Sequence, residues 1–229
     1  MADAQSIRAS VRGAPFTVSF IAICALVFLV GLVSPIAQRE IFLRFSQINV
    51  AVGEGEWWRL FTSAFLHAGP AHIAFNMWAL YQFGPPLERQ IGTAAFAAMC
   101  LACAAWGGTA VYLLTGPRSA VVGASSAIFG VFGAWLYASY LSRETPMGQA
   151  QFRNLMNLLA INAFLSFAVP RISWQGHAGG LAAGLAIAAG WRQLPPPATP
   201  THRALLATAA AAIAVAIVFL YPESAAQSR

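Results

Sequence analysis

The sequence predicts an all-α protein that crosses a membrane several times, and three observations carry this prediction. Only 9% of the 229 residues are charged, against about 25% in an average soluble domain. Hydrophobic residues make up 59% of the chain and the mean hydropathy is +0.65, which is more apolar surface than a soluble globule of this size can bury. Long charge-free runs match helices of about 20 residues that cross a ~30 Å hydrocarbon core. A disordered chain and a two-domain soluble enzyme are excluded.

Seven runs without Asp, Glu, Lys or Arg are long enough to be transmembrane helices, which satisfy every backbone polar group inside lipid. The fifth run is the shortest. In chain order the runs are Phe16–Ile36, Leu60–Leu87, Gln90–Pro117, Ser119–Ser142, Asn154–Pro170, Ile172–Trp191 and Ala204–Pro222.

The polar segments divide the chain into a core and an additional helix. We expect an N-terminal tail over residues 1–14, a core over 15–192 with a long first loop over 37–69, a Pro-rich linker over 193–203, a last transmembrane helix over 204–222 and a C-terminal tail over 223–229. Aromatic and charged residues alternate in the first loop, which suits a segment in the membrane interface. The N-terminal tail lacks the apolar stretch and cleavage site of a signal peptide, so we expect the first helix to be retained.

The basic character of the chain points to a membrane and not to nucleic acid. Its net charge of +6 comes from 13 arginines, since there is no lysine, and these arginines stand singly between the spans, as membrane-flanking residues do. Arg8 and Arg12 precede the first span and predict a cytoplasmic N-terminus. Cys100 and Cys103 have a C-x-x-C spacing without a second pair, so we expect small buried residues and no metal site.

Polar side chains inside spans are costly in lipid and therefore informative. His72 and Asn76 lie four residues apart in the second span, on one face of a helix. Ser125 lies in G-A-S-S-A-I-F-G of the fourth span, and His177 lies in G-H-A-G-G-L-A-A-G of the sixth. Together these residues supply a nucleophile, a general base and an oxyanion donor.

A count of depth brings these groups together, because the second, fourth and sixth spans run in the same direction. At 1.5 Å per residue, Asn76, Ser125 and His177 each lie roughly 9–10 Å below the start of their helix, nearer the outer face than the midplane. The helix starts used for this count are Pro70, Arg118 and Arg171.

Each residue alone has a simpler interpretation. A lone serine in a membrane helix usually bonds its own backbone, an asparagine commonly joins helices, and a lone histidine more often packs or relays protons. Gly180 and Gly184 form a small-xxx-small pair typical of close helix packing. Their occurrence together favours an active site, and the small residues around Ser125 and His177 allow the two helices to approach closely.

With these motifs in order, residues from about 15 to 190 resemble the rhomboid intramembrane serine proteases. The motifs are Trp58-Arg59 in the first loop, His67, His72 and Asn76 at the start of the second helix, Gly84 and Glu88 near its end, Gly123-Ala124-Ser125 as the nucleophile motif, and His177, Gly180 and Gly184 in the sixth helix. One position departs from the family pattern, since Ser126 stands where the family has glycine. The register of the motif selects Ser125.

The resemblance implies a six-helix core followed by a seventh helix, and a Ser-His dyad without an orienting carboxylate. Ser125 would be the nucleophile, His177 the general base, and Phe129 the ring that stacks on the imidazole. The Ser125 N–H and the side chains of His72 and Asn76 would stabilise the oxyanion. Supporting roles fall to Gly123, Gly180, Gly184, Trp58, Arg59 and His67, and no cofactor is expected.

The expected substrates are transmembrane segments of membrane proteins, cut near their outer ends, and the expected location is a cell membrane, here a bacterial inner membrane. Two alternatives remain open from the residues. One is a membrane haem or quinone protein that uses His67, His72 and His177 as ligands. The other is a non-catalytic relative that binds membrane clients, against which the presence of both Ser125 and His177 argues.

Overall fold

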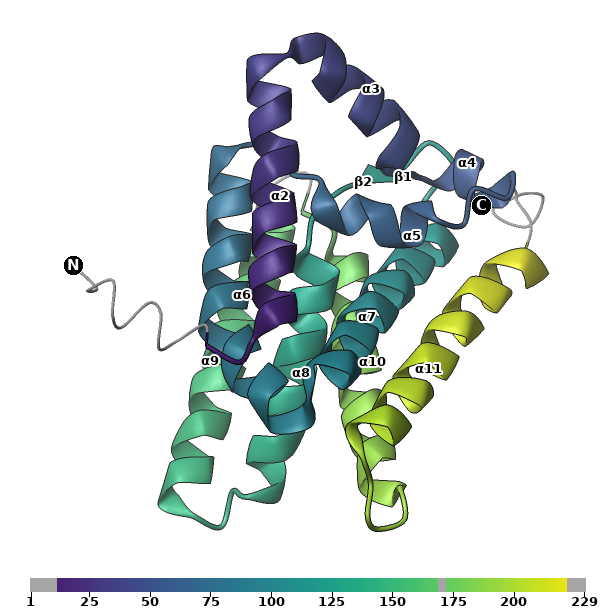
Figure 1. Ribbon diagram of the computed structural model, residues 1–229. Coiled ribbons are helices and arrows are strands. Elements are labelled where there is room, and N and C mark those ends of the chain that lie inside the picture. The colour runs from purple at the N-terminus through teal and green to yellow at the C-terminus, as the bar shows by residue number, and fades with distance from the viewer. Residues whose placement is uncertain (1–11, 169–171, 222–229) are drawn as a thin grey trace.

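The computed structural model describes residues 12–168 and 172–221, and they form a bundle of long helices with a lateral first loop (Figure 1). The elements are α2 (Pro15–Val33), α3 (Pro35–Phe45), β1 (Gln47–Ile48), α4 (Asn49–Gly53), α5 (Arg59–Thr62), the 3-10 turn η1 (Ser63–Phe65), α6 (Pro70–Ile91), α7 (Thr93–Leu114), β2 (Ala120–Val121), α8 (Ser125–Leu141), α9 (Pro146–Ala168), α10 (Trp174–Gln193) and α11 (Pro200–Leu220). The all-α prediction is confirmed.

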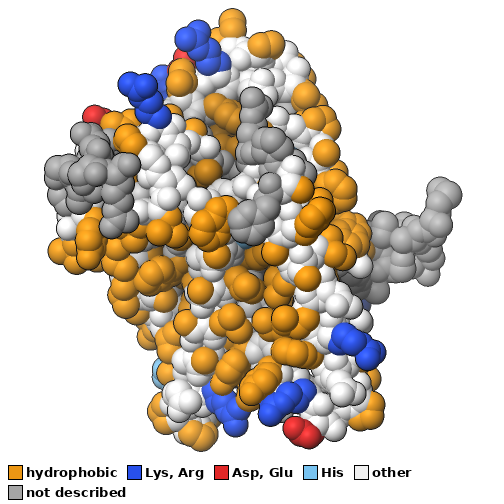
Figure 2. Space-filling model, turned by 180° about the vertical axis from the view of Figure 1, so that it is seen from behind, with side chains coloured by type: hydrophobic (Ala, Val, Ile, Leu, Met, Phe, Trp, Pro, Cys, Tyr) orange, Lys and Arg blue, Asp and Glu red, His pale blue; other side chains and the backbone are white. Residues whose placement is uncertain are grey.

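In the part of the chain that the structure describes, three helices, α2, α7 and α11, are each long and apolar enough to cross a membrane. Figure 2 shows hydrophobic side chains across the middle of one face and arginines towards its two ends. These features belong to a multi-pass membrane protein, while the division into six helices plus one stays a prediction.

Several helix boundaries differ from the charge-free runs. α6 begins at Pro70 and not at Leu60, because the residues between them form α5, η1 and a short extended stretch. α9 begins at Pro146, ahead of the expected run, since the exposed Arg153 is carried on the helix without ending it. The first loop is largely helical. Residues 1–11 and 223–229 of the expected tails, and residue 222 of the expected last helix, lie outside the described residues.

The equal-depth count is wrong for the fourth span. α8 begins at Ser125 itself, and Arg118 lies in a turn before β2, in which the N–H of Ser119 donates to the carbonyl of Gly116 at 3.0 Å. Backbone N–H groups of Asn49 and Val50 donate to the carbonyls of Ser119 and Pro117, at 3.1 and 2.9 Å, and these non-local bonds hold the turn against the first loop. Arg171, the other assumed helix start, lies outside the described residues.

α8 lies against both α7 and α10, and glycines allow the closest approach. A Cβ at Gly180 or Gly184 of α10 would overlap the backbone of Ser126 or Gly130 in α8. The expected close-packing role of the two α10 glycines is therefore confirmed. This contact fixes where α10 carries His177 relative to the start of α8.

Gly84 and Glu88, the motif near the end of α6, hold the start of α2. Glu88 is buried, and its carboxylate accepts hydrogen bonds from the backbone N–H groups of Phe16 and Thr17, at 2.8 Å each, and from the Thr17 hydroxyl at 2.7 Å. The first N–H groups of a helix have no partner inside it, so Glu88 caps α2 from a neighbouring helix. Gly84 leaves room for Thr17, since a Cβ there would lie 2.9 Å from the threonine oxygen.

α11 is fixed to α7 by three side chains that lie along one face of α7. Trp106, Thr109 and Tyr112 donate hydrogen bonds at 2.9, 3.1 and 2.7 Å. Their acceptors are the backbone carbonyls of Ala210, Ala214 and Tyr221. The last helix is thus anchored by polar contacts as well as by apolar packing.

Candidate active site

The segment that leads into α8 is held by the first loop. β1 pairs antiparallel with β2, with Gln47 opposite Val121, and the backbone N–H of Gly123 donates to the carbonyl of Ser63 at 2.9 Å. The Gln47 side chain donates to the carbonyl of Gly108 in α7 at 2.8 Å. The first loop therefore positions the residues immediately before Ser125.

Trp58 and Arg59 differ in their surroundings. The buried Arg59 guanidinium donates to the carbonyl of Ser46 at 2.7 Å and forms an ion pair with Glu56, so it links two turns of the first loop. Trp58 is exposed and its ring packs edge-on against Trp57, which suits a membrane interface. Both residues support the loop.

Gly123 is required by its conformation and by its neighbours. Its φ of 127° lies in a region that L side chains rarely adopt. A Cβ at this position would also lie 2.6 Å from Nε2 of His72 and 3.8 Å from Nδ2 of Asn76. The two α6 side chains therefore converge beside the turn that precedes Ser125.

After their own hydrogen bonds are made, His72 and Asn76 each keep one N–H group that can donate beside Gly123. The N–H of Ala68 approaches Nδ1 of His72 at 3.5 Å, and because a backbone N–H can only donate, the neutral ring carries its proton on Nε2. Asn76 uses one amide hydrogen on the carbonyl of His72, at 3.1 Å. Its NH₂ group has a second hydrogen to donate. The site can thus offer two side-chain donors to an oxyanion beside Gly123.

The imidazole of His177 lies on Phe129. The two rings are stacked, with centroids 4.1 Å apart and planes 10° from parallel. Phe129 follows Ser125 by four residues, so both occupy one face of α8. His177 Nδ1 lies 3.1 Å from the hydroxyl oxygen of Ser166 in α9. Stacking thus brings the histidine of α10 to the face of α8 on which Ser125 lies.

Ser126 faces other neighbours. A Cβ at Gly107 of α7 would collide with the Ser126 side chain, and one at Gly176 of α10 would lie 3.1 Å from its hydroxyl oxygen. Ser126 therefore packs between α7 and α10. The two adjacent serines consequently have different surroundings, as the 100° rotation per helical residue requires.

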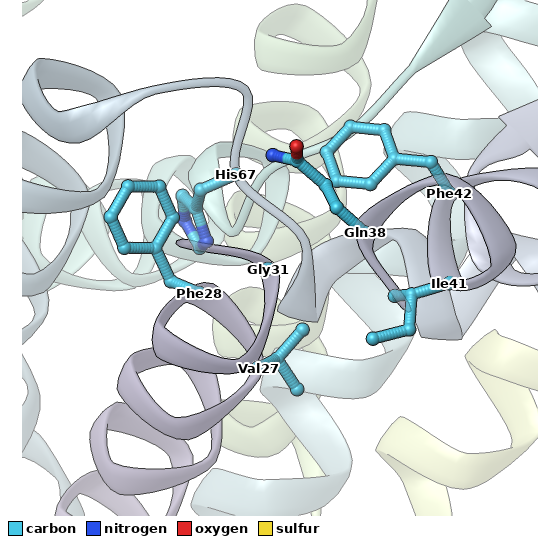
Figure 3. Close-up of a pocket in the computed structure, with 7 residues that line it drawn as sticks. All are labelled: Val27, Phe28, Gly31, Gln38, Ile41, Phe42 and His67. Atoms are coloured by element: carbon cyan, nitrogen blue, oxygen red, sulfur yellow. The ribbon is translucent and has the colours of Figure 1, made fainter. Parts of the chain in front are cut away.

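His67 lies beside the candidate site, in the loop before α6. Its buried ring meets the His72 ring edge-on, with centroids 5.1 Å apart. Burial, aided by the neighbouring His72, lowers the pKa of His67 to about 4, so the ring is neutral at neutral pH. Figure 3 shows the small cavity between α2 and α3 that His67 lines, together with Val27, Phe28, Gly31, Gln38, Ile41 and Phe42.

Residues 54–193 match the rhomboid domain family, which is more than half of the chain. The chain belongs to the rhomboid family. It is 36% identical over 208 residues to the rhomboid protease GluP of Bacillus subtilis, covering 90% of this chain and 40% of that protein. It is 39% identical over 137 residues to the putative rhomboid protease YdcA of the same organism, covering 59% of this chain and 68% of that protein.

A third relative extends the comparison to another bacterium. The rhomboid protease GlpG of an Enterobacter species is 26% identical over 181 residues, which cover 77% of this chain and 63% of that protein. The family resemblance inferred from the motifs is therefore confirmed. This rhomboid chain spans less than half the length of GluP.

Sequence reasoning missed two residues that contact the candidate site. Ser166 contacts His177, and Ser63 holds the backbone of Gly123. Asn162 and Ser166 are polar and four residues apart in the fifth charge-free run, so the rule that identified His72 and Asn76 applies to them equally. Ser63 acts through its backbone carbonyl, which leaves no signal in the sequence.

Proposed function

We propose that this rhomboid is an intramembrane serine endopeptidase that cleaves transmembrane segments of membrane proteins, with Ser125 as nucleophile and His177 as general base. The observation that carries the proposal is the stacking of His177 on Phe129, on the face of α8 where Ser125 lies. Relatives named as proteases support the reaction class. Family membership favours this function over a haem or quinone protein.

The proposed reaction follows the acyl-enzyme route. His177 accepts the hydroxyl proton of Ser125 as the serine oxygen attacks the substrate carbonyl carbon, and then returns that proton to the leaving amine. Water hydrolyses the ester by the reverse sequence of proton transfers. The negative oxygen of each tetrahedral intermediate would receive hydrogen bonds from His72, Asn76 and the Ser125 N–H, which lies at the positive end of the α8 dipole.

The distribution of arginines supports a cytoplasmic N-terminus and an outward-facing site. Among the described residues, Arg39, Arg44 and Arg118 are exposed near the end that carries the site, whereas Arg59 is buried in its ion pair. Near the opposite end, where α2 begins, lie Arg12, Arg89, Arg143, Arg153, Arg192 and Arg203. Cytoplasmic loops carry the excess of basic residues. We accordingly place this end in the cytoplasm and the chain in a bacterial inner membrane.

The decisive experiment combines cleavage with active-site labelling. In liposomes that contain a transmembrane reporter, we expect Ser125→Ala and His177→Ala each to lower kcat by roughly 10⁴-fold or more, with little further loss in the double variant, because the pair acts as a unit. A fluorophosphonate probe should label the native protein and not Ser125→Ala.

The alternative of a client-binding relative gives a different result. Such a protein would bind transmembrane clients without cleavage and would not react with the probe. Wild-type turnover in either single variant would refute the dyad.

A further inference from the structure

We infer that Ser166 of α9 is a positioning residue that holds His177 in the tautomer required of a general base, an inference that rests on the proposed function. Ser166 is buried, with 7% of the residue's surface exposed. Its hydroxyl oxygen lies 3.1 Å from Nδ1 of His177. A buried polar group in contact with the ring of the proposed base calls for an account of where the protons lie.

The second hydrogen bond of Ser166 sets the direction of the first. Its hydroxyl lies 2.8 Å from the carbonyl of Asn162, on its own helix, and a carbonyl can only accept. A hydroxyl has one hydrogen and two lone pairs, so with its hydrogen directed at Asn162 the oxygen presents a lone pair to His177. Nδ1 of His177 must then carry the proton and donate it. The neutral ring consequently keeps the lone pair of Nε2 for the proton of Ser125.

Two contacts from different helices together define the orientation of the imidazole. Stacking on Phe129 of α8 fixes the plane of the ring. A half-turn about the Cβ–Cγ bond keeps that plane but exchanges the positions of Nδ1 and Cδ2. The Ser166 bond from α9 selects which nitrogen faces α9 and which faces away. In soluble serine proteases a carboxylate performs this task. Here a neutral hydroxyl would select the tautomer without placing a negative charge beside the base.

A purely structural role for Ser166 makes the opposite predictions. Serine in a membrane helix often bonds the carbonyl four residues earlier, and such a serine could be replaced without effect on catalysis. Ser139 of α8 provides the matched control, because it is also buried and its hydroxyl donates to the carbonyl of Leu136 in its own helix, at 3.0 Å.

The kinetic test compares Ser166→Ala, Ser166→Thr and Ser139→Ala in proteoliposomes. We expect Ser166→Ala to lower kcat by about tenfold, the effect of one net hydrogen bond, with an unchanged KM. Ser166→Thr keeps the hydroxyl and should restore kcat to within about twofold of the native protein. Ser139→Ala should match the native protein. Unchanged kcat in Ser166→Ala would overturn the inference.

A spectroscopic test reads the tautomer without any need for cleavage. In full-length Ser125→Ala protein with ¹⁵N-labelled histidine, we expect the His177 proton on Nδ1, and a shift of population towards Nε2–H when Ser166→Ala is added. The His177→Gln variant assigns the resonance. A proton on Nε2 with Ser166 present would refute the inference, even if the dyad is correct. Failure of the proposed function appears separately, as cleavage that survives Ser125→Ala or His177→Ala.

Discussion

His72 of α6 and His177 of α10 differ in their hydrogen-bond partners. The difference suits one ring to donate a hydrogen bond and the other to accept a proton. The N–H of Ala68 directs a donor at Nδ1 of His72, which leaves Nε2–H as a donor. Ser166 offers an acceptor to Nδ1 of His177, which leaves Nε2 as an acceptor. One imidazole can therefore stabilise developing negative charge while the other removes a proton. In the proposed mechanism the same side chain would serve both purposes, because the partner of the remote nitrogen selects the tautomer.

This assignment predicts a specific kinetic effect of the α6 side chains. We expect His72→Ala and Asn76→Ala to lower kcat by roughly 10²-fold each, since one oxyanion donor is worth that much in soluble proteases, with a smaller change in KM. Residual activity should remain because the Ser125 N–H is retained. Steady-state cleavage of a transmembrane reporter measures both constants. A raised KM at constant kcat would instead indicate that these side chains bind substrate in its ground state.

The adjacent serines give a second prediction at the scale of single residues. Ser126 packs between Gly107 and Gly176, so we expect Ser126→Ala to keep most of its activity and Ser126→Gly, which restores the family pattern, to be active. In both variants a fluorophosphonate adduct should map to Ser125 by mass spectrometry. An adduct on Ser126 of the native protein would move the nucleophile by one residue.

At the scale of elements, α8 owes its position to backbone contacts that tolerate only glycine. The backbone of Gly130 approaches Gly184 of α10 so closely that a Cβ would overlap its carbonyl. We expect Gly184→Ala to separate α8 from α10, to destabilise the protein by about 1–3 kcal/mol and to lower cleavage, because His177 would move away from Ser125. Thermal unfolding in detergent and reporter cleavage measure the two effects.

Gly116 is the matched control for this substitution. It lies in the segment before α8, and a Cβ there meets no described atom within 4 Å. Gly116→Ala should therefore leave both unfolding temperature and cleavage close to native values. Equal effects at Gly116 and Gly184 would show that the contact between α8 and α10 does not control the site.

Element boundaries were predictable only where local signals fix them. Pro15 and Pro70 open α2 and α6, in agreement with the preference of proline for the first helical turn. The same preference places the start of α11 at Pro200, within the linker expected over residues 193–203. The start of α8 was not predictable, because the preceding residues are as apolar as a span. Their extended form depends on pairing with β1, which lies far away in the sequence. The count of depth depended on this helix start, whereas the order of motifs selects Ser125 without reference to it.

At the scale of the whole molecule, the outer helices are fixed to the core by polar contacts as well as by packing. Glu88 caps α2 from α6, and Trp106 and Thr109 of α7 donate to the backbone of α11. Two apolar helices in lipid gain little from hydrophobic association, so interhelical hydrogen bonds contribute to their placement. The sequence places Glu88 only in a motif that resembles the family's, and its cap on α2 required the structure.

The orientation of the whole molecule yields the last prediction. The arginines indicate that the end containing Glu144 is cytoplasmic and that α3 lies outside, so a cysteine introduced as Arg39→Cys should react with a membrane-impermeant maleimide in intact cells. One introduced as Glu144→Cys should react only after the membrane is opened. Both positions are exposed, and the native Cys24, Cys100 and Cys103 are buried, so the unmodified protein gives the background. The reverse pattern would place the active site in the cytoplasm and require substrates to be cut near their inner ends.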